Sequence, residues 1–321
     1  MIYLENLKLL CNQSKFAILE YIKDKKAYGG ELAKQLVLKI PRIKYIKRGF
    51  LLFTGLIFAA CCITGCLAVH ENRQTEYAVL LGEDASQIPL FPQADVLVVD
   101  GEYFIEADVL QLKEQGVKRV YSYLNVGSLE TFRDYYAVYD RYTLGDYENW
   151  PEEKWVDVSQ EKWQEFVVER ANELILKGFD GLFIDNIDVY YQYPRQEIYE
   201  GIVSILTELH ESGVYIMING GDFFVREYIE NGTEQGRIFD GVNQENVYTA
   251  YNFERKTYGV NPEEEREYWT EYLSYITVNG YEAYDLEYAT DAGIAEAARK
   301  YAFSNGWNCY IADSIELINK K

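Results

Sequence analysis

Two acidic residues that follow apolar strands are the groups in this sequence best suited to chemistry. Residues 182–184 are apolar and run directly into Asp185, and residues 239–244 lead in a similar way to Glu245. In α/β barrels the reactive groups follow such buried strands. Cleavage of a glycosidic bond needs two carboxyl groups, one protonated and one ionised. The repeated pattern predicts such a pair; the alternative is that one acid caps a helix and the other is solvated.

Other common chemistries lack the residues that they need. The sequence has two histidines, His70 and His210, and no His-Glu-x-x-His motif, histidine pair at i and i+4, or Cys-x-x-Cys pair for zinc. It also has no Gly-x-Ser-x-Gly elbow for a serine nucleophile. We therefore predict carboxylate chemistry with no metal and no cofactor.

Eight segments have the length and composition of strands, and most are separated by helical patterns. The predicted strands are 77–81, 96–100, 119–125, 181–185, 214–219, 241–244, 282–286 and 308–312. The clearest helix has Ser159 as its predicted N-cap and ends at Gly178, and the other helical patterns span 196–211, 263–278 and 292–304. This alternation predicts an α/β fold, a (β/α)8 TIM barrel. An open doubly wound sheet is the alternative, but a glycine-rich phosphate loop is missing after the first strand.

Polar side chains stand at the carboxyl ends of seven predicted strands. They are Asp100, Asn125, Asp185, Asn219, Glu245, Asp285 and Asp313. Because the strand ends of a barrel meet at one mouth, we expect these residues to converge on one cleft. The longest connection, 127–157, is rich in tyrosine and tryptophan. It predicts an aromatic wall on which sugar rings stack.

The two parts of the chain carry opposite net charges. Residues 1–65 contain 11 Lys and Arg against 4 Asp and Glu, whereas residues 66–321 contain 20 against 48, a net charge of −28. Such a body attracts a cationic polymer and repels nucleic acid. We predict a cationic partner and no nucleic-acid binding, although acidity can also serve solubility alone.

The N-terminal region has the order of an export signal. Basic residues within 39–48 precede the apolar segment 50–60. The sequence Ile-Thr-Gly-Cys at 63–66 resembles a bacterial lipobox, which predicts lipidation of Cys66. The alternative is an uncleaved signal anchor over residues 49–69, which carry no charge. Both predictions place the acidic body outside the cytoplasm, anchored to the membrane.

The predicted organisation has four parts. Residues 1–36 resemble the opening helices of a winged helix-turn-helix repressor but stop before a recognition helix, so we predict a truncated remnant without DNA binding. Residues 37–65 form the signal peptide with its lipobox, and residues 66–76 a tether. The (β/α)8 domain spans residues 77–321.

Four motifs together resemble the endo-α-1,4-polygalactosaminidases, glycoside hydrolase family 114. They lie at 121–127, 155–158, 178–188 and 284–289, and the Gly-Phe-Asp-Gly…Asp-Asn-x-Asp block at 178–188 is the most specific. The resemblance implies a TIM barrel that cuts α-1,4-linked galactosamine-rich exopolysaccharide of biofilm matrix. It implies Asp185 and Glu245 as the catalytic residues. One departure is Ser128, where relatives often carry a glutamate, which predicts a missing cleft carboxylate.

The protonation states assign the two roles. Asp185 has the lower intrinsic pKa, which favours it as nucleophile, and the charge of Asp185 raises the pKa of Glu245, which favours that residue as acid/base; the reverse assignment stays open. The predicted substrate-binding residues are Asp100, Tyr123, Asn125, Glu130, Trp155, Asp188, Asn219, Asp285 and Tyr288. The partner expected is a cationic galactosamine-rich polysaccharide. The alternatives are a barrel glycosidase for another α-glycan and a lipid-anchored binding protein without turnover.

Overall fold

The computed structural model describes residues 76–231 and 236–319. They belong to one compact unit, Arg73–Lys321. The predicted remnant, the signal peptide and Cys66 lie outside the described residues. Within the two described ranges, no helix is long and apolar enough to span a bilayer.

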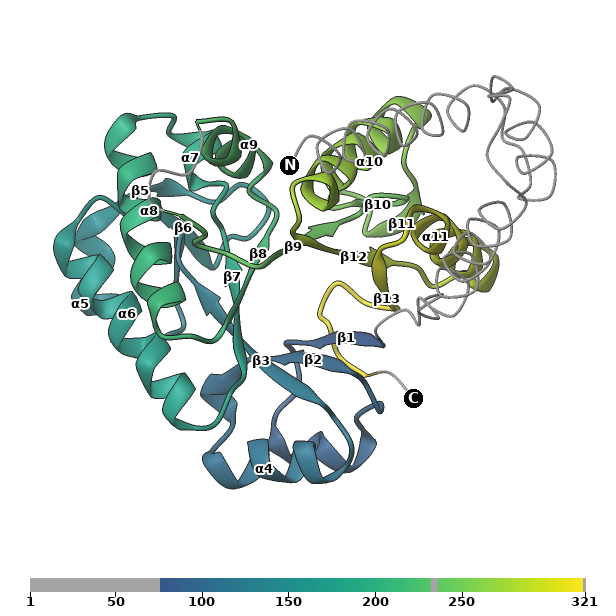
Figure 1. Ribbon diagram of the computed structural model, residues 1–321, viewed down its shortest axis with the longest axis horizontal. Helices are drawn as coiled ribbons and strands as arrows, with labels where there is room; N and C mark the ends of the chain where they lie inside the picture. Colours follow the sequence, from purple (N-terminus) through teal and green to yellow (C-terminus); the bar gives the residue numbers. More distant parts are fainter. Residues whose placement is uncertain (1–75, 232–235, 320–321) are drawn as a thin grey trace, which may run out of the picture. The chain divides into compact units, whose positions relative to one another are not determined.

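Eight parallel strands form a nearly closed ring, which confirms the predicted TIM barrel (Figure 1). In ring order they are β1 (Tyr77–Leu80), β2 (Val96–Val99), β3 (Arg119–Asn125), β7 (Gly181–Asp185), β8 (Tyr215–Asn219), β9 (Gly241–Glu245), β12 (Glu282–Tyr288) and β13 (Asn308–Ala312). Ladders join each strand to the next, and β13 and β1 lie side by side where the ring meets. All eight strands coincide with predicted segments to within two residues.

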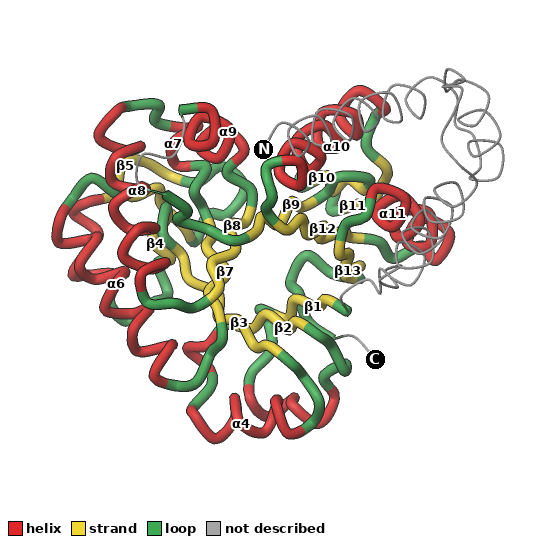
Figure 2. Tube along the Cα trace, in the orientation of Figure 1, coloured by secondary structure: helices red, strands yellow, loops and turns green. Residues whose placement is uncertain are grey.

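Helices cover the outside of this ring (Figure 2). The longer ones are α4 (Glu106–Glu114), α6 (Glu161–Leu176), α8 (Gln196–Glu211), α9 (Asp222–Glu230), α10 (Glu263–Val278) and α11 (Ala292–Asn305), and the short ones are α5 (Tyr136–Tyr139) and α7 (Val189–Gln192). Ser159 does not cap α6, because the N-cap is Gln160 and the Ser159 hydroxyl donates to Asp157 instead. Gly178, with a φ of +94°, follows the end of α6 as predicted.

Alternating residues of each strand fill the barrel interior. The inner cluster includes Tyr121, Phe183, Met217 and Tyr284, and the residues between them pack against the helices. Because successive side chains point to opposite faces of a strand, the last inward-pointing residue of each strand faces the mouth. This alternation decides which polar strand ends enter the cleft.

Two small sheets stand on the connections after the barrel strands. The connection 127–157 forms a three-stranded sheet of β4 (Ser128–Glu130), β6 (Glu153–Val156) and β5 (Thr143–Asp146), in which β6 lies between the other two. After β9, β10 (Thr249–Asn252) and β11 (Thr257–Val260) form a hairpin. The sequence patterns did not predict these strands.

The aromatic wall predicted in this connection is only partly present. Tyr139 packs on Trp163 of α6 and belongs to the core. Tyr147 and Trp150 do line the cleft, and Trp150 also contacts Phe253 of the hairpin connection edge to face.

Candidate active site

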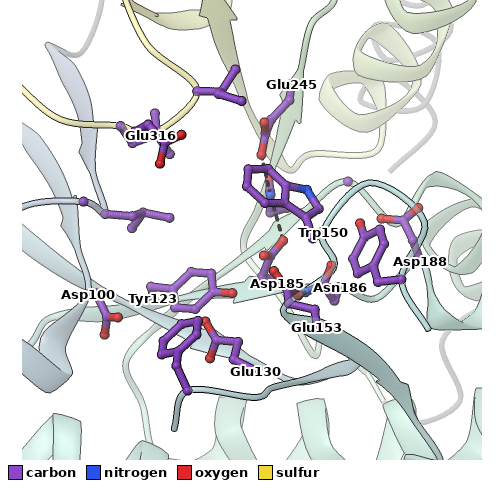
Figure 3. A pocket seen from close by; sticks show the side chains of 18 of the residues that line it. Asp100, Tyr123, Glu130, Trp150, Glu153, Asp185, Asn186, Asp188, Glu245 and Glu316 are labelled. Atoms are coloured by element: carbon purple, nitrogen blue, oxygen red, sulfur yellow. Dashed lines mark hydrogen bonds between the residues drawn. The ribbon is translucent and has the colours of Figure 1, made fainter. Parts of the chain in front are cut away.

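A cavity of about 400 Å³ opens at the carboxyl ends of the barrel strands (Figure 3). Its lining includes two strand-end acids, several further carboxylates and aromatic rings. Among these residues are Asp100, Tyr123, Glu130, Tyr147, Trp150, Glu153, Asp185, Asp188, Asn219, Glu245 and Tyr288. The acidic and aromatic lining suits a polar, cationic ligand with flat faces.

One amide nitrogen joins the two predicted catalytic carboxylates. Asn219 Nδ2 donates to Asp185 Oδ1 at 2.9 Å and to Glu245 Oε1 at 2.8 Å. Asp185 Oδ1 and Glu245 Oε1, which accept hydrogen bonds from the same nitrogen at these distances, are therefore at most about 5.7 Å apart. Retaining glycosidases hold their carboxyl groups about 5–5.5 Å apart and inverting ones about 6.5–9.5 Å. Figure 3 shows Asp185 and Glu245 facing each other across this bridge.

A chain of side chains orients the bridging amide. Asn243 Nδ2 donates to Asn219 Oδ1 at 2.7 Å, and Tyr77 donates in turn to Asn243 Oδ1 at 3.2 Å. Because Asn219 Oδ1 accepts the hydrogen bond from Asn243, the hydrogens of the Asn219 amide are on Nδ2, which faces the two carboxylates. Tyr288 donates to Glu245 Oε2 at 2.6 Å and so fixes the second oxygen of that carboxylate.

Burial raises the pKa of both predicted catalytic carboxyls, Asp185 and Glu245. Hydrogen bonds from Asn219 and Tyr123 oppose the rise at Asp185, and those from Tyr288 and Asn219 oppose it at Glu245. The charge of Asp185 raises the pKa of Glu245 further. This electrostatic asymmetry favours the proton on Glu245 and the negative charge on Asp185.

Asp188 lies farther along the same loop and lines the cavity. Burial, followed by the charges of Asp222 and Asp185, raises its pKa to about 7. Its Oδ2 accepts the Gly221 N–H at 3.1 Å. A side chain at Gly220 would meet the same oxygen at 2.7 Å, and the φ of Gly220 is +66°. This turn therefore requires glycine for both its conformation and its contact with Asp188.

Asp100 and Glu130 line the cavity but are already paired with a buried arginine. Arg133 donates to Asp100 Oδ2 at 2.8 Å and to Glu130 Oε2 at 2.6 Å, and it also contacts Glu102 at 3.2 Å. Burial raises the pKa of Asp100 and of Glu130, and Arg133 opposes both rises. No pattern in the sequence identified Arg133 as a cleft residue.

Glu153 supplies a cleft carboxylate that no sequence pattern identified. Its Oε2 accepts the Ser128 hydroxyl at 2.5 Å and Asn186 Nδ2 at 3.1 Å. Position 128 itself carries no carboxylate, as expected from the sequence, and Glu153 places one beside Ser128. The antiparallel pairing of β4 with β6 places Glu153 opposite Glu130 and beside Ser128. Residue spacing along the chain could not reveal this pairing.

Three predicted binding residues do not line the cavity. Asn125 is buried and donates to Ser128 at 2.8 Å. Trp155 is 4% exposed and stacks on Tyr147. Asp285 is fully buried and points away from the barrel interior, because its neighbours Tyr284 and Leu286 point inward. The prediction that Asp285 binds substrate at the mouth was wrong.

Comparison with known proteins identifies the family. The model of glycoside hydrolase family GH114 matches residues 66–313. The chain belongs to this family. The resemblance inferred from the motifs is therefore confirmed, and the barrel is a glycoside hydrolase domain. Comparison with curated protein sequences gave no match.

Solved structures have the same fold as this GH114 chain. The glycoside hydrolase domain of PelA from Pseudomonas aeruginosa is 21% identical with a TM-score of 0.66, covering 76% of this chain and 96% of its own. Ega3 from Aspergillus fumigatus, solved in complex with galactosamine, is 18% identical with a TM-score of 0.60, covering 77% of this chain and 93% of its own. Both likenesses support the TIM barrel.

Proposed function

We propose that the protein is an endo-acting hydrolase of α-1,4-linked, galactosamine-rich exopolysaccharide such as that of biofilm matrix. The observation that carries the proposal is the Asp185–Asn219–Glu245 bridge in an acidic, aromatic-lined cleft. The galactosamine bound to Ega3, a protein with the same fold, supports the sugar class. The net charge of −28 over residues 66–321 supports a partly deacetylated, cationic chain as the substrate.

The close approach of the two carboxylates supports a retaining mechanism. An Asp185 oxygen attacks the anomeric carbon while Glu245 gives its proton to the departing glycosidic oxygen, so that a glycosyl ester forms and the glycosidic bond breaks. Glu245, now ionised, takes a proton from water. The water oxygen attacks the anomeric carbon and releases Asp185 as a carboxylate.

The surroundings of each acid fit these roles. Tyr288 and Asn219 hold both oxygens of Glu245, and the charge of Asp185 keeps the proton on Glu245 at the start of the reaction. The hydrogen bond from Asn219 Nδ2 holds Asp185 Oδ1, so that the Asp185 carboxylate points across the cleft. Tyr147 and Trp150 line the cavity, where their rings can stack on sugar faces.

The test is the release of new reducing ends from purified α-1,4-linked galactosamine polymer. The wild-type chain should release short oligomers, whereas Asp185→Asn and Glu245→Gln should fold, bind polymer and lose about 10²–10⁴ of the rate. Proton NMR of the first product should show the α anomer. Release by neither wild type nor variants would refute hydrolysis of this polymer, and a β anomer would refute retention.

We further propose that the domain acts outside the cytoplasm, held at the membrane by lipidated Cys66 or by a signal anchor over residues 49–69. The supports are the basic-then-apolar order of the segment and the sequence Ile-Thr-Gly-Cys at 63–66. A polysaccharide of the cell exterior would then be directly accessible to the cleft.

A further inference from the structure

Glu153 is a cleft carboxylate whose hydrogen bonds all fall on one oxygen. Oε2 accepts Ser128 Oγ at 2.5 Å, Asn186 Nδ2 at 3.1 Å and Asn125 Nδ2 at 3.5 Å. Oε1 receives no hydrogen bond from the described residues, and the side chain lines the cavity. One oxygen therefore holds the side chain in place and the other is available to a ligand.

The donors to Glu153 are themselves held rigidly. Asn186 Nδ2 also bonds Asn125 Oδ1 at 3.1 Å and Ser128 Oγ at 3.0 Å, and the Ser128 N–H donates to Asn125 Oδ1 at 3.0 Å. Asn186 has a φ of 64°, in the left-handed region, and is 5% exposed. Asn186 is buried, has a left-handed backbone conformation and donates a hydrogen bond to Glu153. These features indicate that the Glu153 carboxylate is held in a fixed position.

The neighbouring acids differ from Glu153 in their bonding. Asp100 and Glu130 share one paired cation, Arg133, which also contacts Glu102. Asp185 and Glu245 share the Asn219 amide and carry the reaction. A cation that enters the Asp185 side of the cleft therefore meets two acids without a paired cation among the described residues, Glu153 and Asp188. Three donors hold Glu153 Oε2, whereas one backbone N–H holds Asp188 Oδ2.

We propose that Glu153 binds the ammonium group of a galactosamine unit next to the scissile bond and so selects deacetylated over N-acetylated sugar at that subsite. The inference rests on the proposed function and specifies it. An ammonium donates a charge-assisted hydrogen bond to Oε1, which is about twice as strong as a neutral one. An N-acetyl group offers one neutral N–H and adds bulk. Glu153 is thus a specificity-determining residue that takes no part in bond cleavage.

The charges around Glu153 predict a pH dependence for this selection. Burial raises the pKa of Glu153 to about 7, the Ser128 hydrogen bond opposes the rise, and the charges of Asp185 and Glu130 add to it. Tyr123 and Tyr147 also face it and are neutral in this range, because burial raises their own pKa. An arriving ammonium favours the ionised form, so the preference for deacetylated sugar should rise as Glu153 ionises toward pH 7. It should fall again at higher pH, where the amino group of the sugar loses its own proton.

The experiment compares two substrates with the full chain in detergent. One is an α-1,4-linked galactosamine heptamer, and the other is the same heptamer fully N-acetylated. Glu153→Gln should lower the ratio of kcat/KM values, deacetylated over acetylated, at least about 10-fold at pH 7.5, which equals about 1.4 kcal/mol. The rise of the ratio toward pH 7 should disappear in this variant. The matched control, Glu152→Gln, changes the adjacent exposed acid and should leave the ratio unchanged.

The outcomes separate this inference from the proposed function. If the wild type cleaves neither heptamer, the proposed function fails. If it cleaves both and Glu153→Gln lowers both kcat/KM values equally, the selective role of Glu153 is overturned. Should Glu153→Gln fail to fold, Ser128→Ala keeps the charge but releases Oε2. That variant should raise KM for the deacetylated heptamer alone, and an equal rise for both would overturn the inference.

Discussion

The buried carboxyl of Asp188 should make the stability of the protein depend on pH. Its pKa is raised from 3.8 to about 7, chiefly by burial. The folded protein therefore keeps a proton that the unfolded chain has lost between these two values. The corresponding stabilisation is fully present below pH 3.8 and is lost as pH rises through 7.

The size of this effect follows from the pKa alone. One pKa unit corresponds to 1.36 kcal/mol, so the free energy of unfolding falls by about 1.6 kcal/mol between pH 5.5 and 7, and by about 2 kcal/mol between pH 5.5 and 8, through this one group. Asp188→Asn removes the titration and retains an oxygen for the Gly221 N–H. The difference in unfolding free energy, variant minus wild type, should thus grow by about 2 kcal/mol between pH 5.5 and 8.

Urea denaturation of both proteins at pH 5.5 and 8 measures this difference. Asp146→Asn is the control, because the Asp146 side chain is 90% exposed and its removal should leave the two pH curves parallel. Parallel curves for Asp188→Asn as well, within about 0.5 kcal/mol, would refute the reasoning, since Asp188 would then be hydrated in the folded protein. Asp188→Asn should also reduce kcat less than Asp185→Asn.

Three further predictions concern the bridge, the charge and the anchor. Asn219→Ala removes hydrogen bonds that lower the pKa of Asp185 and Glu245. Both limbs of the pH–rate profile should therefore move to higher pH, and kcat/KM should fall about 10–100-fold. Limbs that do not move would contradict the role of Asn219 in bridging the two carboxylates. Affinity for deacetylated polymer should fall between 0.05 and 0.5 M salt, because the Debye length is only about 10 Å at 0.1 M. Affinity for acetylated polymer should change little. If salt changes both affinities equally, the acidic residues of the domain serve solubility and not substrate binding. Cys66→Ala should abolish incorporation of labelled palmitate, and label that persists would count against the lipobox.

The barrel strands, and the strand end that carries Asp185, were predictable because both depend on local regularity. The apolar runs that end at Asp185 and Asn219 are buried on both faces, so their lengths and spacing show in the sequence. The direction in which a polar residue points was harder to predict. Asp285 lies on a strand that continues to Tyr288, and the alternation set by Tyr284, Leu286 and Tyr288 sends Asp285 toward the helices. An apolar run that is buried on both sides does not reveal which face is inside.

Arg133 and Glu153 could not be predicted from the sequence for a different reason. Both lie in the connection 127–157, whose strands are only three or four residues long. Strands of this length give too few repeats for a periodic signal. The position of Glu153 is set by the antiparallel pairing of β4 with β6, in which Glu153 lies opposite Glu130. These two residues are 23 positions apart in the sequence. Such pairing is a tertiary property.

The ring order explains why an amide, and not a third acid, stands between the catalytic carboxylates. Asp185 ends β7 and Glu245 ends β9, and β8 lies between them. Neighbouring strands are about 4.8 Å apart, so the two backbones start nearly 10 Å apart and the side chains must converge to bind one amide nitrogen. Two carboxylates brought this close repel each other unless a donor stands between them. Asn219, at the end of β8, gives one N–H to each, and Asn243 holds the other end of its amide. An aspartate at this position would add a third negative charge, whereas the amide lets Asp185 stay ionised while Glu245 keeps its proton.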